Sequence, residues 1–357
     1  MEPFQTYLWR VERIDRPTKD SATIHFNTNG IVFQHAAGQF INLHVPVRGN
    51  EHIRSYSISS WYNVHSCPSI TVKKIEGGLV SNFLVNELRE GTMLQVEGPI
   101  GSFMPSSFAQ LAKDVVLIAG GSGISPLWSI AHYLLYQTTT RVLLLYGNRR
   151  TGEIIFFEEI EQLKELFPGR LTVFHALSQE TELPATIKEG VAARLSPMIL
   201  RKALKRLLPE TYSTAAFFVC GPEGLMTDAR DSLLGLGIEP GQIQQESFAG
   251  SETIATEIPL DTNLEREVLL LFEEQINLLE VKPKEPILDA ALRERINIRY
   301  SCRAGTCGTC WAKNTSGKVW MKSNYALQPS QVEEGYILLC QSYPVTDDVT
   351  VEINPFI

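Results

Sequence analysis

The amino-acid sequence predicts a chain of three domains: a small antiparallel β-barrel, an α/β domain with a parallel sheet, and a small α+β domain. Short strands with period-two patterning and frequent turns fill residues 5–108. Continuous apolar strands alternate with helical stretches from residue 115 onward. After a polar, unpatterned stretch, a third unit combines strands, one helix and four cysteines. The predicted boundaries are 1–110, 111–249, a linker at 250–263, and 264–357.

Composition and charge limit the class of protein. A chain of 357 residues with 44% apolar and 20% charged residues is ordinary for a globular protein with several cores. The net charge of −8 argues against a general nucleic-acid binder, which would carry a basic stripe. The N-terminus lacks the features of a signal peptide, and no apolar run approaches the roughly 18 residues that cross a bilayer. With Cys67 and Cys220 expected to be unpaired, we expect a cytoplasmic protein without a transmembrane segment.

The first domain is predicted from five strands and one helix. The strands are expected at 22–26, 40–45, 55–59, 70–74 and 93–97. A helix is expected over 80–88, directly after Gly77 and Gly78. Because free N–H groups at a helix start attract phosphate, this turn is a candidate anion site.

One of these strands carries a cation, an aromatic ring and hydroxyls in the run Arg54-Ser55-Tyr56-Ser57-Ile58-Ser59-Ser60. Such a set can hold a planar anionic cofactor: Arg54 can pair with a phosphate, Tyr56 can stack on a ring, and Ser57 can bond a ring nitrogen. Aromatic and serine residues are also common in strands, so the run alone favours plain packing. Its weight rises because the Gly77–Ser81 turn offers a second phosphate site on the same barrel.

The second domain is predicted from buried strands that alternate with helices. The strand 115–119 is continuously apolar and runs into the glycine-rich turn Gly120–Pro126, in which Pro126 is expected as the first helical residue. Apolar residues then recur at helical spacing over 127–135. Further strands are expected at 142–146, 171–174 and 217–220, and helices at 157–167 and 223–234. This alternation predicts a parallel sheet covered on both faces.

Two strand ends in this domain are candidate nucleotide contacts. Open α/β sheets bind nucleotides at the carboxyl ends of their strands, where Gly120–Pro126 lies. The turn departs from G-x-G-x-x-G, and glycine turns also serve packing alone. The second strand end, Cys220-Gly221-Pro222, should open onto the same crevice. A lone cysteine such as Cys220 is more often a small buried apolar residue than a functional group.

The third domain is organised around Cys302, Cys307 and Cys310, spaced C-x4-C-x2-C, with Cys340 further along. Thiols at this spacing belong on a loop around an object larger than one ion, and the small residues between them bring backbone N–H groups close to it. The spacing is that of a plant-type [2Fe–2S] centre held by four thiolates. A structural zinc site is the alternative, although such sites usually pair C-x2-C with a second short pair. The flanking elements are expected as strands at 266–272 and 349–353 and a helix near 287–295.

The motifs of the first two domains resemble those of the ferredoxin–NADP⁺ reductase family. Arg54–Ser60 is similar to the family's flavin-binding motif R-x-Y-S-x-x-S. Gly120–Pro126 looks like its nicotinamide-nucleotide loop G-G-x-G-[IV]-[ST]-P, and Cys220-Gly221-Pro222 looks like its C-G-P turn. The resemblance implies an antiparallel β-barrel that binds flavin, followed by an α/β domain that binds NAD(P).

The C-terminal part, including Tyr300–Gly305, closely resembles plant-type ferredoxins, which implies a β-grasp [2Fe–2S] domain. The domain order, with the stretches Asn324–Leu327 and Gly335–Gln341, looks most like reductase components that serve oxygenases and desaturases, such as that of phenylacetyl-CoA epoxidase. The resemblance therefore covers nearly the whole chain. It implies a protein partner that accepts electrons.

The resemblance also implies roles for single residues. It puts Arg54 on the flavin diphosphate, Tyr56 against the isoalloxazine ring and Ser57 near N5. It puts Glu246 and Phe248 close to the flavin, although reductases without a fused ferredoxin often end in such an aromatic residue and this chain continues past it.

The expected functional residues fall into three sets. The catalytic set is Ser57, Cys220, which is implied near the nicotinamide, and Glu246. The cofactor-binding set is Arg54, Tyr56, Ser57, Ile58, Gly78, Leu79, Val80, Ser81, Gly120, Gly121, Gly123, Ile124, Ser125, Pro126, Arg149, Cys220, Gly221, Pro222 and Phe248. The metal ligands are Cys302, Cys307, Cys310 and Cys340.

The choice between NADPH and NADH depends on the residues after two strands. Arg149 and Arg150 can hold a 2′-phosphate, and Ser178 matches part of the Ser-Arg pair that the family uses for that phosphate. Gln179 stands where the arginine would be, which removes a charge-assisted contact. We expect NADPH, with a solvated pair of arginines as the alternative.

These expectations combine into one hypothesis of electron flow, from NAD(P)H to flavin to cluster to an external acceptor. The Gly78–Ser81 turn favours FAD, while related reductases with this domain order use FMN. The expected acceptor is an oxygenase or desaturase. The alternatives are a reductase of a hybrid-cluster protein and a non-catalytic NAD(P)H-sensing protein.

Overall fold

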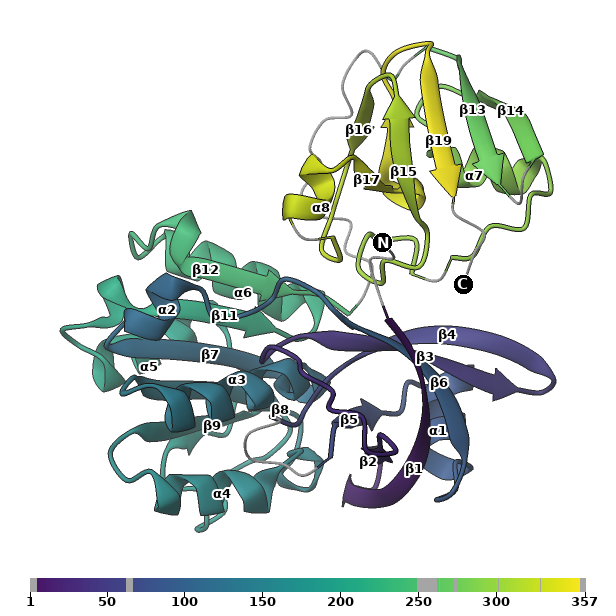
Figure 1. Ribbon diagram of the computed structural model, residues 1–357. Coiled ribbons are helices and arrows are strands. Elements are labelled where there is room, and N and C mark those ends of the chain that lie inside the picture. Colours follow the sequence, from purple (N-terminus) through teal and green to yellow (C-terminus); the bar gives the residue numbers. More distant parts are fainter. Residues whose placement is uncertain are drawn as a thin grey trace.

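The computed structural model describes residues 5–61, 67–248, 262, 264–272, 275–300, 302–327 and 329–353. Figure 1 shows the barrel and the α/β domain side by side, with the third domain, coloured green to yellow, lying over the barrel. The linker predicted at 250–263 lies outside the described residues, apart from Thr262. Among the helices that are described, none is both long and apolar enough to span a membrane.

The first sheet is antiparallel, with the strand order β4-β3-β6-β1-β2-β5. A bridge between Ile58, just after β4, and Ile70 in β5 joins its two edges, so the sheet curls into the predicted barrel. Apolar residues such as Ile41 and Leu43 fill its core. Its elements are β1 (Gln5–Thr18), β2 (Ser21–Asn27), β3 (Phe40–Val47), β4 (Asn50–Ser57), β5 (Ser69–Lys73), α1 (Leu79–Asn86) and β6 (Met93–Ile100).

The second sheet is parallel, with the order β10-β9-β8-β7-β11-β12. Apolar cores lie on both of its faces, one beneath α3 and α4 and the other beneath α5 and α6. Its strands are β7 (Asp114–Gly120), β8 (Arg141–Asn148), β9 (Leu171–Leu177), β10 (Gly190–Val191), β11 (Ala216–Cys220) and β12 (Ile243–Glu246). Its helices are α2 (Ser107–Leu111), α3 (Ile124–Gln137), α4 (Phe157–Leu166), α5 (Pro197–Leu207) and α6 (Glu223–Leu234), with short 3₁₀ turns at Gly121–Gly123, Thr151–Glu153, Tyr212–Thr214 and Pro240–Gln242.

The chain order of this sheet sets where a ligand can bind. From β7 the chain moves outward through β8, β9 and β10, then returns to the other side of β7 as β11. The carboxyl ends of β7 and β11 therefore flank a topological switch point, which is where open α/β sheets bind ligands. Both predicted strand-end loops, after Gly120 and after Cys220, lie there.

The third sheet is mixed, with the order β14-β13-β19-β15-β17, and α7 packs against its core. Phe40 and Ile100 of the barrel belong to the same apolar cluster, so this domain is packed on the barrel. Its elements are β13 (Arg266–Phe272), β14 (Gln275–Val281), α7 (Ile287–Arg293), β15 (Trp311–Ser316), β16 (Val319–Met321), α8 (Pro329–Glu333), β17 (Tyr336–Leu338), a 3₁₀ turn (Leu339–Gln341), β18 (Ser342–Pro344) and β19 (Val349–Ile353).

Some predicted elements were displaced. The strand predicted at 55–59 runs over Asn50–Ser57, because Arg48 and Gly49 adopt left-handed conformations and turn β3 directly into β4. The helix predicted to begin at Pro126 begins at Ile124, so the proline is its third residue. Its missing N–H still falls in the first turn, where donors have no helical partner.

Candidate functional site

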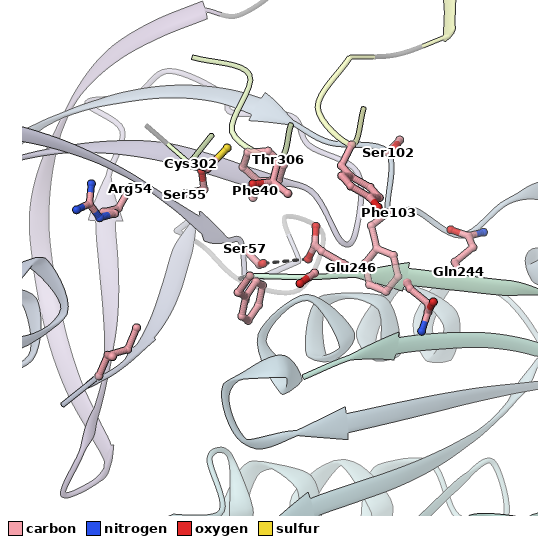
Figure 2. Close-up of a pocket in the computed structure, with 15 residues that line it drawn as sticks. Phe40, Arg54, Ser55, Ser57, Ser102, Phe103, Gln244, Glu246, Cys302 and Thr306 are labelled. Atoms are coloured by element: carbon pink, nitrogen blue, oxygen red, sulfur yellow. Dashed lines mark hydrogen bonds between the residues drawn. The ribbon is translucent and has the colours of Figure 1, made fainter. Parts of the chain in front are cut away.

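A cavity of about 550 Å³ lies where the three domains meet. Ser57 and Arg54 of β4 line it from the barrel, and Glu246 of β12 lines it from the α/β domain (Figure 2). Cys302 and Thr306 line it from the third domain. Because each domain supplies part of the wall, a ligand in this cavity would contact all three.

The three residues expected to be catalytic lie near one another. Ser57 Oγ donates a hydrogen bond to Glu246 Oε2 over 3.2 Å, and Glu246 pairs in register with Cys220 across β11 and β12. Burial raises the pKa of Glu246 to about 8, against the opposing effect of the Ser57 hydrogen bond. Burial and the Glu246 carboxylate raise the pKa of the Cys220 thiol well above its ordinary value. Burial therefore favours the uncharged forms of both groups.

The other residues of the Arg54–Ser60 run lie partly at the junction cavity and partly in the barrel core. Arg54 lines the cavity, and its Nη1 donates to the Ile53 carbonyl over 2.8 Å. Tyr56 packs against the barrel core, and burial raises its pKa above the ordinary value. The Ile58 side chain is fully buried in that core, which leaves only its backbone to meet a ligand.

The glycine turn before α1 borders a second cavity of about 590 Å³, which Gly78 and Leu79 line. Asn82 Nδ2 donates to the Ile75 carbonyl over 2.9 Å, and the Ser81 hydroxyl accepts from the Ile75 N–H over 3.2 Å. These side chains hold the turn, and within the described part of the chain no side chain caps the first N–H groups of α1. Val80 is buried in the barrel core. The turn therefore presents backbone donors of the kind that bind phosphate.

The two strand-end loops of the α/β domain pack tightly on each other. A Cβ at Gly123 would lie 2.1 Å from the Cys220 carbonyl oxygen, and a Cβ at Gly120 would lie 2.7 Å from Pro222. Gly121, with φ +53°, adopts a left-handed conformation. Ser125 Oγ donates to the Thr71 carbonyl of the barrel over 3.4 Å. Backbone can therefore approach a ligand closely here, while part of the glycine requirement comes from packing.

Arg149 and Arg150 point to different partners. Arg149 Nε donates to Glu153 Oε2 over 2.9 Å, and Lys73 of the barrel contacts the same oxygen at 3.3 Å. Arg150 Nε donates to Gln179 Oε1 over 3.2 Å. Arg149 is thus bonded to a carboxylate, while Arg150 is bonded to the neutral amide of Gln179.

The cysteine loop brings its four thiols together as two pairs. The Cys302 thiol accepts from the N–H groups of Ala304 and Cys307, each over 3.3 Å. The bonded Cys307 thiol lowers the pKa of Cys302 to about 5, and its own pKa is raised in return. Cys310 and Cys340 form the second pair, in which the pKa of Cys340 is lowered and that of Cys310 is raised.

This donor set fits a two-metal cluster. Two thiol pairs with backbone N–H groups aimed at sulfur suit two irons with bridging sulfides. Gly305 is left-handed with φ +75°, and a Cβ there would lie 2.6 Å from the Ser323 carbonyl oxygen.

Sequence reasoning missed several cavity residues. Phe40, Phe103 and Tyr325 line the junction cavity, but each lies in a local sequence that looks like ordinary core or loop. Thr306, which directly precedes the expected ligand Cys307, was expected only as one of the small residues of the cysteine loop and not as a cavity residue.

Three known protein families match the chain, one in each of its three domains. Residues 9–104 match the model of an oxidoreductase FAD-binding domain, and residues 117–231 match that of an oxidoreductase NAD-binding domain. Residues 273–345 match the model of a 2Fe-2S iron-sulfur cluster binding domain. The three domains and their cofactors are thereby those expected from the sequence.

Relatives are similar over nearly their whole length. One subunit of 1,2-phenylacetyl-CoA epoxidase from Escherichia coli (strain K12) is 32% identical, over 96% of this chain and 96% of its own. The ferredoxin reductase component of 3-ketosteroid-9-alpha-monooxygenase from Rhodococcus rhodochrous is 32% identical, over 90% of this chain and 88% of its own. The glycine betaine monooxygenase reductase subunit of Pseudomonas aeruginosa (strain UCBPP-PA14) is 29% identical, over 98% of each chain.

Solved structures share the fold at lower identity. Phthalate dioxygenase reductase aligns over 98% of both chains with a TM-score of 0.56 and 20% identity. An intact type IV self-sufficient cytochrome P450 monooxygenase aligns with 98% of this chain and 41% of its own, with a TM-score of 0.67 and 19% identity.

Proposed function

The chain belongs to the family of oxygenase reductase components built from FAD-binding, NAD-binding and [2Fe–2S] domains, and from this premise we propose that it carries electrons from NAD(P)H to a partner oxygenase or desaturase. The observation that carries this proposal is the junction cavity, which Ser57, Glu246 and Cys302 line from three different domains. A redox group in that cavity would touch the nucleotide side and the cluster side at once.

The residues of the cavity have separate tasks in this proposal. When bound, FAD links the two-electron hydride of NAD(P)H to the single-electron capacity of a [2Fe–2S] cluster. Burial favours the neutral form of Glu246, which accepts a hydrogen bond from Ser57 Oγ at Oε2. Phe40 and Phe103 form an apolar part of the wall, which limits water near the reacting atoms. The four thiols would hold the [2Fe–2S] cluster, which takes up one electron at a time.

Two cavities support FAD rather than FMN as the flavin. Ile75 lines the junction cavity and Gly77, two residues later, lines the second cavity beside Arg48 and Phe83. Two residues span at most about 7 Å, so one elongated ligand can occupy both spaces. The uncapped start of α1 lies next to this turn and suits the pyrophosphate between the two halves of a dinucleotide.

NADPH remains the proposed nucleotide, with Arg150 in place of Arg149 as the residue that meets the 2′-phosphate. The Arg149 guanidinium is bonded to Glu153, whereas the exposed Arg150 side chain donates to the amide oxygen of Gln179. A cytoplasmic location is also proposed, because a buried cysteine that forms no disulfide, Cys220, suits a reducing compartment.

One spectrum and one pair of variants test the proposal. Purified protein should contain FAD, iron and acid-labile sulfide, and NAD(P)H should bleach both chromophores under anaerobic conditions. Cys340→Ser should abolish transfer to one-electron acceptors while leaving reduction of the flavin by NAD(P)H intact. Cys67→Ser is the matched control, because this thiol lies outside the cluster loop, and it should behave as wild type. Equal loss of both activities in Cys340→Ser would contradict the proposed order of transfer.

A further inference from the structure

The outer face of strand β3 is buried beneath the ferredoxin domain. Phe40, Asn42 and His44 alternate along β3 with Ile41 and Leu43, which belong to the barrel core. Asn42 is 0% exposed, and Phe40 belongs to the apolar cluster of the ferredoxin domain. Because successive strand residues point to opposite faces, β3 presents one set of residues to each domain.

The side chain of Asn42 bonds both cofactor-binding segments at once. Its Nδ2 donates to the Cys307 carbonyl oxygen over 2.8 Å, and its Oδ1 accepts from Ser55 Oγ over 2.8 Å. Ser55 lies between Arg54 and Tyr56 on β4 and lines the junction cavity. A single buried amide therefore joins the flavin-binding strand to a ligand residue of the cluster. Its donor and its acceptor are both used, as a buried amide requires.

A group of charges reinforces this contact. Glu97 of β6 pairs with Asn42 across the strands, and its Oε1 accepts from Arg299 of the ferredoxin domain over 2.8 Å. His44 Nε2 lies 3.0 Å from the same oxygen, and His44 Nδ1 lies 3.2 Å from Glu51 Oε2. Burial by itself lowers the pKa of His44, but the two carboxylates outweigh it and leave that pKa raised. The buried carboxylate of Glu97 is thus compensated from both domains.

We propose that Asn42 is a positioning residue for electron transfer from flavin to cluster, and that the seam formed by Asn42, His44 and Glu97 is the docking site of the ferredoxin domain on the barrel. The proposal rests on the function proposed above. Asn42 fixes the Cys307 segment against the strand that binds the flavin, so it sets the separation and orientation of the two redox groups. Electron transfer slows as the separation of the two redox groups grows, so loss of this contact should slow it.

Asn42→Asp tests this without changing the size of the side chain. It replaces the donor to the Cys307 carbonyl by an acceptor and puts a second carboxylate near Glu97 Oε2, which lies 3.5 Å from Asn42 Nδ2. In anaerobic stopped-flow mixing with NAD(P)H, flavin bleaching should keep the wild-type rate, and the following reduction of the cluster should slow severalfold. Asn50→Asp makes the same change at the exposed start of β4 and should leave both rates unchanged.

A second variant keeps the proposal testable if Asn42→Asp fails to fold. Arg299→Gln removes the guanidinium through which the ferredoxin domain contacts Glu97 of the seam. Because the Arg299 side chain is 53% exposed, the change should leave the fold intact. It should also slow cluster reduction, by a smaller factor. In the oxidised protein, without turnover, limited proteolysis between the second and third domains should be faster for both seam variants. Dithionite should still reduce their clusters to the wild-type EPR signal.

The outcomes separate the two proposals. Slower cluster reduction with unchanged flavin bleaching, iron content and EPR signal supports Asn42 as a positioning residue. Wild-type cluster reduction in both seam variants overturns it, as does loss of the cluster itself, because either result removes the role in positioning. If the wild-type protein fails to reduce its cluster with NAD(P)H, the proposed function fails, irrespective of Asn42.

Discussion

Replacing Gly123 by alanine should damage the nucleotide site while sparing the flavin and the cluster. The added Cβ would lie 2.1 Å from the Cys220 carbonyl oxygen, 2.4 Å from its carbon and 2.7 Å from the Gly221 nitrogen. All three atoms are backbone, so no side chain can swing away. To restore ordinary contact, the loop before α3 and the end of β11 must separate by about 1 Å, which is a backbone shift of the kind that overpacking forces.

The cost of that shift can be bounded. Overpacking of this kind costs about 1–3 kcal/mol, and about 2–4 °C is lost per kcal/mol in a domain of this size, so the melting temperature should fall by roughly 2–12 °C. Since the displaced loops are the expected nucleotide contacts, kcat/KM for NAD(P)H should fall by about 100-fold. Thermal unfolding followed by circular dichroism and steady-state reduction of ferricyanide measure the two effects.

Gly152→Ala is the matched control for this prediction. Gly152 lies in the 3₁₀ turn Thr151–Glu153 after the neighbouring strand β8, and a Cβ there would meet no atom of the described residues within 4 Å. It should keep the wild-type melting temperature and kinetics. If Gly123→Ala behaves like Gly152→Ala, then the tight packing of the two strand-end loops is not what the nucleotide site depends on, and the reasoning fails.

Three further predictions concern other parts of the site. The pKa of Glu246 is raised from 4.5 to about 8, so the stability that this group contributes is fully present below pH 4.5 and is lost as the pH rises through about 8. Glu246→Gln should therefore flatten the fall of the melting temperature between pH 5 and pH 8. An unchanged slope would contradict the raised pKa. Arg150→Ala should lower kcat/KM for NADPH by roughly 10-fold to 100-fold and leave kcat/KM for NADH unchanged, because only NADPH would lose a charge-assisted hydrogen bond. Equal effects on both nucleotides would refute a 2′-phosphate contact. Gly305 has φ +75°, and Gly305→Ala would put a Cβ 2.6 Å from the Ser323 carbonyl oxygen, so the variant should bind less iron per chain. Full iron loading would show that the loop tolerates the change.

The elements that were predicted correctly are those whose burial is visible in their own residues. The strand at 115–119 is apolar throughout because both of its faces are covered, and the helix after it repeats apolar residues at helical spacing. Strand β1, at Gln5–Thr18, was missed although Tyr7, Trp9 and Val11 alternate with exposed residues, because the exposed Leu8 breaks the apolar–polar alternation in the sequence. Strand β14, at Gln275–Val281, was missed for a similar reason, since it is an edge strand with exposed Ile276 and Leu278.

The sequence by itself determined the cofactors, because each depends on a local run of residues: the Arg54–Ser60 strand, the Gly120–Pro126 turn and the spacing of Cys302, Cys307 and Cys310. Tertiary structure alone decided how these sites face one another. The bond from Asn42 to the Cys307 carbonyl joins residues 265 positions apart, and in the sequence Asn42 is only one polar residue in an alternating strand. Contacts of this kind leave no local pattern, because they arise from the packing of one finished domain on another.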